Sequence, residues 1–328
     1  MADALINLVQ FAQGLQNPLS SGMIEQFARS SDVLETIPFK SANQGVNRFD
    51  RETSEPAVAF RALNAEPEIS FGSEETFQDA VYPISGLIEF DRIKLKRYGE
   101  DKRRTYMKGQ MKKGARVWTT TFINGDNSSD PKEFDGLENR LTATNGGASS
   151  TDVDGSNDDS RLLANATGSG GAALSLAKLD KAIELVNEPT HILMSRDMKT
   201  KMQAAARSPT ISNNQITMDM DSDLGRRVTR FGDIPILTGY PVGKGSTFLP
   251  YDEVAYGGGS ANTTSIYVVS FREDGVCGIQ TSAPEFEPVD TDRGVFKRDL
   301  FEWDCGITIE DFYSALRVSS ITNAAITA

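Results

Sequence analysis

The feature that most limits the possible folds of this chain is a long polar stretch, Ser41 to Ala80, with too few apolar residues to build a core of its own. Turn-forming residues interrupt it repeatedly, namely Gly45, Pro56, Pro67 and Gly72. About forty such residues are unusual inside a compact domain, so the stretch is either disordered or projects and packs on another surface. Phe49, Phe60 and Phe71 favour projection, because large apolar side chains gain free energy only when they are covered.

Charge is distributed unevenly along the chain. The net charge of −12 at pH 7 argues against a dedicated nucleic-acid binder, because affinity for phosphate depends on clustered Lys and Arg. The segment from Arg92 to Arg116 nevertheless carries eleven basic and two acidic residues, a local balance of +9. The stretch from Ser41 to Ala80 carries three basic and eight acidic residues, a balance of −5. This segregation predicts that the two segments meet, within one subunit or between neighbouring subunits.

At 328 residues the chain is long enough to bury a substantial core, in two domains or in one elaborate domain. No apolar run approaches the roughly 20 residues that cross a bilayer, and Asp3 stands where an export signal would carry a basic residue. We therefore expect a soluble protein that is not exported. Cys277 and Cys305 are the only cysteines, and we expect both to be reduced core thiols.

Periodicity predicts the elements of the first half of the chain. Ser20 and Ser21 can cap a helix that ends near Asp32, and the alternation from Tyr82 to Leu95 predicts a strand. A long helix is predicted from Gly99 to Phe122, with most of its basic residues on a solvated face. Its apolar stripe consists of Met107, Met111, Ala115, Trp118 and Phe122.

The second half alternates helices and strands. Thr142 to Ala173 is rich in Gly, Ser, Asn and Asp, which indicates an internal boundary or a surface loop. A helix capped by Ser175, the strand His191 to Met194, a helix capped by Ser195 and the strand Ile234 to Leu237 then follow. This order predicts a small α/β domain. Three more strands are predicted to close the chain, at 265–271, 276–280 and 307–318.

No catalytic constellation stands out in the sequence. A catalytic site needs a nucleophile, a base and a group that stabilises charge. His191 is the only histidine, and its place at the head of a short apolar strand indicates a structural role. One histidine cannot build a His-rich zinc site. Paired carboxylates are always available in so acidic a chain, so a hydrolase that uses buried carboxylates stays open as an alternative.

Three segments resemble ligand loops without matching them. Gly239 to Ser246 has the wrong glycine spacing for a phosphate loop. The glycines at Gly168, Gly170 and Gly171 do not have the spacing of a dinucleotide fingerprint, and no strand precedes them. Asp152 to Ser160 lacks the central glycine and the closing Glu of a calcium loop. We therefore predict no cofactor and no bound metal.

Taken in order, these segments resemble the major capsid proteins of tailed bacteriophages of the Hong Kong 97 type, whose fold is shared with encapsulin shells. The sequence INGDNSSDPKEFDGL after the long helix is similar to the G-D and G-L pattern that follows their spine helix. THILMSRDMKTKM followed by GDIPILTGYPV resembles their axial domain, and CGITIEDFYSALRVSS resembles the last strand of their peripheral domain. The resemblance extends from about Ser20 to Ile321, which is nearly the whole chain.

The resemblance implies an α+β, Hong Kong 97-like fold. Its parts are an N-terminal arm (1–40), an extended loop (41–80), a peripheral domain with the spine helix (81–147), an axial α/β domain (148–300) and a C-terminal strand of the peripheral domain (301–328). It implies a structural protein, not an enzyme, that self-assembles into hexamers and pentamers of an icosahedral head around double-stranded DNA. An encapsulin-like nanocompartment shell is the alternative. The extended loop contains no Lys, so the covalent crosslinks of some relatives are not expected.

The resemblance also implies partners and contact residues. The partners are other copies of the chain, a separate scaffolding protein, a portal, a decoration protein and, through weak non-specific contact, packaged DNA. The expected location is the virion, assembled in the cytoplasm of a bacterial host, with no membrane. The candidate intersubunit residues of the extended loop are Arg48, Arg51, Phe60, Arg61, Glu66, Glu68, Phe71, Glu74 and Glu75. The basic spine region consists of Arg92, Lys94, Lys96, Arg97, Lys102, Arg103, Arg104, Lys108, Lys112, Lys113 and Arg116.

Overall fold

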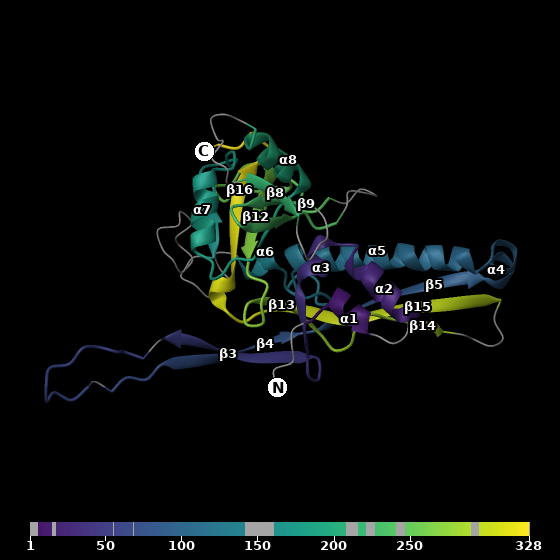
Figure 1. Cartoon of the computed structure of the whole chain (residues 1–328), viewed down its shortest axis with the longest axis horizontal. Coiled ribbons are helices and arrows are strands. Elements are labelled where there is room, and N and C mark those ends of the chain that lie inside the picture. The colour runs from purple at the N-terminus through teal and green to yellow at the C-terminus, as the bar shows by residue number, and fades with distance from the viewer. Residues whose placement is uncertain are drawn as a thin grey trace.

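The computed structural model describes residues 6–14, 18–54, 56–67, 69–141, 161–207, 216–220, 227–240, 247–289 and 295–327. These residues form two units, each built on a sheet, and a two-stranded hairpin that projects from them (Figure 1). Among the described residues, none of the helices combines the length and the apolar character that a membrane span requires.

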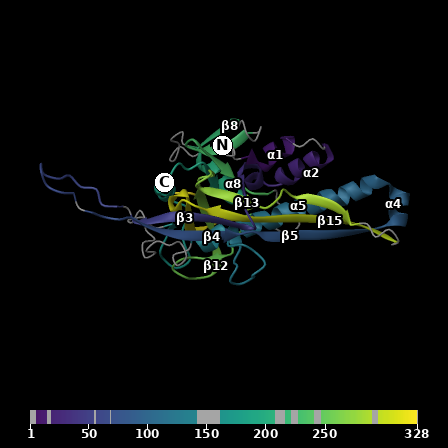
Figure 2. The ribbon, with the colours of Figure 1, turned by 90° about the horizontal axis from the view of Figure 1, so that it is seen from below.

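The first unit is a six-stranded sheet with helices on one face (Figures 1 and 2). In sheet order its strands are β1 (Ile6–Asn7), β2 (Pro38–Ser41), β13 (Val276–Gln280), β15 (Phe296–Ile309) and β14 (Glu285–Val289), with β5 (Tyr82–Asp91) on the other edge of β15. Its helices are α1 (Leu8–Gly14), α2 (Pro18–Ala28), α3 (Asp32–Thr36), α4 (Arg92–Tyr98) and α5 (Glu100–Asn124). The long α5 lies parallel to β5 and β15, as Figure 1 shows.

The core of this unit lies between α5, α2 and the sheet. Alternate residues of β15 point into it, so Phe301 and Trp303 are buried while Glu302 between them is exposed. Trp118 of α5 and Phe27 of α2 meet the Trp303 ring, with ring centroids 5.9 and 5.2 Å apart. The predicted long helix is therefore confirmed, together with its apolar stripe from Met111 to Phe122.

The second unit is an eight-stranded sheet flanked by two helices. In sheet order its strands are β6 (Leu162–Ala164), β16 (Ala315–Thr322), β12 (Ala261–Val269), β7 (His191–Leu193), β10 (Ile234–Leu237), β9 (Arg227–Phe231) and β8 (Ile216–Met220), with β11 (Glu253–Val254) beside β12. Its helices are α7 (Leu176–Glu184) and α8 (Arg196–Ala205), and α6 (Leu137–Arg140) lies between the units (Figure 1).

The predicted helix and strand alternation of this unit is confirmed. β7 and β10 are parallel neighbours, with Ile192 opposite Ile236, and α8 is the helix that follows β7 along the chain. Ser195 caps α8, because its Oγ accepts a hydrogen bond of 3.1 Å from the Met198 backbone N–H. Ser175 is the N-cap residue of α7, but its side chain makes no capping hydrogen bond.

Two predicted strands differ in length from the structure. The strand predicted from Tyr82 to Leu95 ends at Asp91, whose carboxylate accepts a hydrogen bond of 2.7 Å from the Ile93 backbone N–H and begins α4. The single strand predicted at 307–318 is two strands, β15 and β16, because a 3-10 turn (Phe312–Ser314) separates them. Asp311 caps that turn by accepting 2.9 Å from the Tyr313 backbone N–H.

The predicted axial domain (148–300) and C-terminal peripheral strand (301–328) do not coincide with the two units. The strands β13, β14 and β15 belong to the six-stranded sheet, whereas the C-terminal β16 pairs with β12 in the eight-stranded sheet. In the predicted N-terminal arm (1–40), helices occupy most of the described residues and β2 joins the sheet; the helix predicted after Ser20 and Ser21 corresponds to α2. The predicted boundary between 147 and 148 lies outside the described residues.

Candidate assembly surfaces

The predicted extended loop is a projecting hairpin. Its strands β3 (Val46–Ser54) and β4 (Ser73–Ala80) pair antiparallel, from Val46 opposite Ala80 to Ser54 opposite Ser73. The described residues between the strands, 56–67 and 69–72, form a tip without helix or strand that points away from both units (Figure 1, left). The segment is therefore ordered at its base and uncovered at its end.

Arg51 fixes the base of the hairpin to β15. Its Nε donates to the Glu310 carbonyl oxygen at 3.1 Å, and its Nη2 donates to the Ile309 carbonyl oxygen at 2.8 Å. The guanidinium carbon lies 4.5 Å from the centre of the Phe77 ring, which stacks on Phe49 at 5.9 Å. Burial lowers the pKa of Arg51. Arg51, predicted as an intersubunit contact, is used within its own subunit.

Ion pairs give the base further support. Glu310 accepts hydrogen bonds from Lys40 Nζ at 2.8 Å and from Asn47 Nδ2 at 3.1 Å. Arg140 of α6 lies 2.8 Å from Asp79 of β4. These pairs are partly shielded from water, so they hold the direction of the hairpin more firmly than exposed pairs would.

The tip, in contrast, has no cover. Five large apolar side chains there are 86 to 110% exposed, namely Val58, Phe60, Leu63, Ile69 and Phe71. Single exposed apolar residues are common on monomeric proteins, but a contiguous group of this kind marks a surface that another molecule covers. Phe60 and Phe71 are both exposed in this tip, and their role as intersubunit contacts stays a prediction.

The polar residues of the loop are mostly exposed as well. Arg48, Glu66, Glu74 and Glu75 are exposed, and Arg61 donates a hydrogen bond of 2.7 Å to the Ala65 carbonyl oxygen within the tip. Glu68 lies outside the described residues. Because Asp79 is engaged by Arg140, the acidic character available to a partner comes from the outer half of the hairpin.

The basic spine region divides into exposed and engaged side chains. Arg103 makes two hydrogen bonds to the buried carboxylate of Asp299 and so ties α5 to β15. Arg116 is half-buried, with its guanidinium carbon 5.8 Å from the centre of the Tyr240 ring. The exposed members are Arg92, Lys94, Lys96, Arg97, Lys102, Arg104, Lys108, Lys112 and Lys113.

Within one subunit, the acidic tip and the basic end of the spine lie far apart. Figures 1 and 2 both place the hairpin tip at one end of the long axis and α4 at the other. The sequence analysis left open whether the two segments meet inside a subunit or between subunits. The tip and α4 therefore do not meet inside one subunit.

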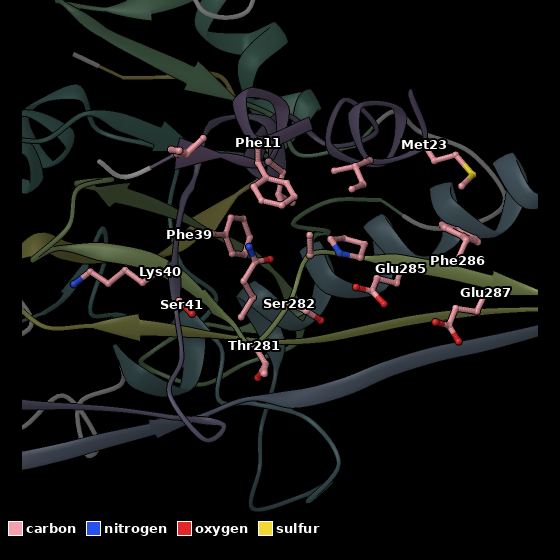
Figure 3. A pocket seen from close by; sticks show the side chains of 16 residues that line it. Phe11, Met23, Phe39, Lys40, Ser41, Thr281, Ser282, Glu285, Phe286 and Glu287 are labelled. Carbon is pink, nitrogen blue, oxygen red and sulfur yellow. The ribbon is translucent and has the colours of Figure 1, made fainter. Parts of the chain in front are cut away.

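A well-formed groove lies between the N-terminal helices and the chain before β14 (Figure 3). It has a volume of about 800 Å³. Phe11, Met23 and Phe39 contribute apolar surface, while Lys40 and Glu287 stand at opposite ends. Neither the histidine nor a cysteine lines this groove, so it lacks the groups of the nucleophilic sites considered above.

The side chains with the greatest catalytic potential occupy structural positions. His191 Nδ1 lies 2.9 Å from Thr190 Oγ1, and its ring packs on Phe271. Cys277 and Cys305 are both buried, as predicted. Burial raises the pKa of Cys277 to about 12 and that of Cys305 well above its usual value, so neither is a ready nucleophile.

The described chain does bring two carboxylates together, at a position that sequence reasoning missed. Glu138 of α6 and Glu253 of β11 both contact Arg317 of β16, at 2.9 and 2.8 Å. Burial raises the pKa of Glu138. The arginine between them offsets one of the two carboxylate charges, and neither acid lines the groove described above. The arrangement is an electrostatic joint between α6 and the eight-stranded sheet, not the open carboxylate pair of a hydrolase.

The segments that resemble ligand loops supply no ligand set among the described residues. No group of three or more metal-ligating side chains occurs there. Gly170 and Gly171 have positive φ and form a turn, in which the Gly170 backbone N–H donates to the Gly258 carbonyl oxygen at 2.8 Å. Residues 152–160, and residues 241–246 of the segment that begins at Gly239, lie outside the described residues.

No family model and no curated protein matches the chain. Solved structures match nearly its whole length. The SrpI encapsulin of Synechococcus elongatus has a TM-score of 0.60 at 11% identity, over 90% of this chain and 89% of that chain. The capsid of a native GTA particle has a TM-score of 0.57 at 12% identity, over 98% and 95% of the two chains.

A third match is to Mycobacterium phage Bobi, with a TM-score of 0.55 at 9% identity over 91% of each chain. Identities this low establish shared architecture rather than shared activity. All three matches extend over both sheet-based units, so the similarity is to the complete arrangement and not to one common motif. The chain has the Hong Kong 97-type fold of phage capsid and encapsulin shell proteins.

Proposed function

We propose that the chain is the major capsid protein of a tailed bacteriophage, and that it assembles into hexamers and pentamers of an icosahedral head around double-stranded DNA. The observation that carries the proposal is the hairpin, which combines a firmly anchored base with an uncovered apolar tip. If the protein functioned as a monomer, the apolar tip would remain exposed to water. The fold supports the same conclusion, because its solved neighbours are shell-forming proteins.

The tip of one subunit is proposed to lie on the neighbour near the basic spine region. Contact between two different surfaces of the same chain is heterologous, so successive subunits form a ring if the rotation between them closes. Exposed ion pairs contribute about 0.2 to 1 kcal/mol each, whereas covering one large apolar side chain contributes about 1.5 to 3 kcal/mol. Phe60 and Phe71 therefore supply most of the contact free energy. The charges of Glu66, Glu74 and Glu75 set which surface the tip chooses.

Self-assembly is the direct test. The chain is expressed with and without its proposed scaffolding protein, and particles are sought by electron microscopy and sedimentation. Closed shells with pentameric and hexameric rings are expected. A chain that stays monomeric at high concentration under both conditions contradicts the proposal.

The contact itself is tested by charge reversal. The triple variant Glu66→Lys, Glu74→Lys, Glu75→Lys is expected to hinder shell closure, most clearly at low salt, because it replaces attraction by repulsion. All three side chains are exposed, so the free subunit should keep its melting temperature. The matched control changes the same residues to Asp, which retains the charge and should assemble. Normal shells from the Lys variant would exclude the tip as an intersubunit clasp.

Proteolysis gives an independent measure of the same contact. Arg61 lies in the exposed tip and offers trypsin a site. Free subunits should be cut there quickly, and assembled shells slowly, because a docked segment is cleaved only after it leaves its neighbour. Equal cleavage rates in both states would show that the tip remains uncovered in the shell.

An encapsulin-like compartment is the second candidate, favoured by the similarity to the SrpI encapsulin over most of both chains. The contents of purified particles separate the two. Nucleic-acid absorbance supports the phage head, and a co-purifying protein cargo supports the compartment. For the phage head, the scaffolding protein, portal and decoration protein complete the proposed set of partners, and assembly takes place in the cytoplasm of the bacterial host.

A further inference from the structure

The two faces of the six-stranded unit carry opposite charge. On the sheet face away from α5, the alternation of β15 places Glu302, and pairing puts Glu285 of β14 opposite it. Asp304 lies on this face too, two residues after Glu302. Glu89 is there as well but is paired with Arg298 at 2.8 Å. Like charges directly across strands repel, so this face disfavours any further anion.

The helix face carries a row of cations. Arg104, Lys108, Lys112 and Arg116 follow one another at four-residue spacing and therefore lie along one side of α5. Arg104 has only a loose contact of 3.9 Å with Asp101. Within the described chain, Lys108 and Lys112 have no ion-pair partner. Within the described residues, Lys108 and Lys112 therefore hold positive charge that no ion pair of their own subunit neutralises.

The row borders a groove between α5 and α2. Lys112 and Arg116 form one wall, and Glu25, Gln26 and Arg29 of α2 line the other. The groove has a volume of about 580 Å³. Arg29 is held by Glu25 at 2.9 Å and by Glu35 at 3.1 Å, so these acids neutralise the α2 wall and leave the α5 wall positive.

We propose that this basic row and its groove form the surface that meets the phosphate backbone of packaged duplex DNA. The helix face of each subunit then points to the inside of the shell, and the acidic sheet face points outward. This inference rests on the proposed function and adds to it the orientation of the subunit and the residues that touch DNA.

The spacing of the row suits a phosphate backbone. Four residues of helix rise about 6 Å, so the row spans about 18 Å. Over that length one strand of a duplex presents about five phosphates, at one for each 3.4 Å of axis. The row offers no aromatic residues for stacking and no paired amides for reading bases, so contact is sequence-independent. A few cations per subunit in an acidic chain give contact weak enough to permit packaging and release.

The test compares two variants with equal net charge. The row variant carries Arg104→Gln, Lys108→Gln and Lys112→Gln, and the control carries Lys94→Gln, Lys96→Gln and Arg97→Gln in α4. All six side chains are exposed, so folding should be unaffected. Binding of the free subunit to a mixed-sequence 30-base-pair duplex is measured as a function of salt. The slope of log K against log salt is negative, and each lost phosphate contact reduces its magnitude by about 0.9. The magnitude of the slope should therefore fall by about 2.7 in the row variant and by less than half of that in the control.

Assembled particles supply the second measurement. Lys108 and Lys112 should react several-fold more slowly with a small amine-reactive reagent in DNA-filled particles than in empty ones. The reaction rates of Lys94 and Lys96 should be the same in both. Equal labelling of the row in both particles overturns the inference, as does an equal loss of binding in the two variants or no binding by the parent subunit at low salt. A failure to form particles would instead contradict the proposed function, since the duplex measurement uses free subunits.

Discussion

The joint around Arg317 should be the most sensitive electrostatic feature of the subunit. Arg317 is nearly buried in the eight-stranded sheet, where it contacts Glu138 and Glu253 and its Nε donates to Ser265 Oγ at 2.9 Å. Glu138 belongs to α6, the same helix whose Arg140 holds Asp79 at the hairpin base. The substitution Arg317→Met keeps an unbranched side chain and removes the cation.

The expected loss is large because two acids are left behind. Breaking a buried ion pair by removing one partner costs about 3 to 5 kcal/mol, since the other charge stays buried without compensation. Glu253 and Glu138 are both shielded, with 14 and 32% of their side chains exposed. A total stability of about 5 to 15 kcal/mol makes this loss visible in any denaturation curve.

The loss should depend on pH. Burial raises the pKa of Glu138 already in the parent, and Arg317 opposes that rise. Removal of Arg317 lifts the folded-state pKa further above the unfolded value of about 4.3. The stability that a raised carboxyl pKa contributes is complete below the unfolded pKa and is lost as pH rises through the folded pKa. The deficit of Arg317→Met should therefore be larger at pH 8 than at pH 5.

Urea denaturation of the free subunit at both pH values measures this effect. The triple variant that adds Glu138→Gln and Glu253→Gln to Arg317→Met serves as the control, because it removes the stranded charges and should recover much of the loss. A single variant within about 1 kcal/mol of the parent, or a triple variant no better than the single one, would refute an electrostatic origin.

Four further outcomes are expected. Gly109→Ala should raise the urea midpoint and stabilise the fold by up to about 1 kcal/mol, because a Cβ at this helical position meets no atom within 4 Å. Gly278→Ala should lower the midpoint and destabilise the fold by about 1 to 3 kcal/mol, because its Cβ would lie 2.3 Å from the Phe39 ring. Burial raises the pKa of Cys277 to about 12, so native subunits at pH 8 should react with thiol reagents far more slowly than unfolded ones. His191→Gln should leave particle yield unchanged, and the loss of any measured turnover on that change would revive an enzymatic role.

Patterns that involve one element were predictable from the sequence. The stripe of α5 follows from the spacing of Met111, Trp118 and Phe122, and the sequence order of apolar segments and caps gave β7, α8 and β10. Each depends on neighbours within a few residues, where periodicity and capping determine the structure. The projection of the loop was also predictable, because its polarity leaves it no core.

Partners distant in sequence were not predictable. The C-terminal segment was predicted as a strand of the peripheral domain, whereas β16 pairs with β12 of the eight-stranded sheet, about 50 residues earlier in the chain. Arg103 and Arg51 were assigned to a contact surface because their charges lie in basic or loop segments. Their acceptors, Asp299 and the carbonyl groups of 309 and 310, are about 200 to 260 residues away.

The Arg317 joint was missed for the same reason. Glu138, Glu253 and Arg317 come from three separate segments, and no pattern in the sequence links the three. One available signal was the alternation of β16, where a lone Arg stands between apolar residues of a strand, as Leu316 and Val318 show. A charged residue in such a strand requires a buried counter-charge, but only the fold identifies which carboxylate supplies it.

The charges around the tip also bear on the proposed assembly, because they oppose contact between two free tips. An apolar tip that is free in solution would pair with other tips unless something opposes that contact. Exposed acids at Glu66, Glu74 and Glu75 surround the tip, so two tips repel one another, whereas a tip and a basic spine attract. The anchored base adds direction, because Arg51 and Asp79 hold the hairpin along the long axis, away from α4 of its own subunit. Repulsion between like ends and a fixed direction together leave the head-to-tail contact as the favoured one, which is the contact that a closed ring requires.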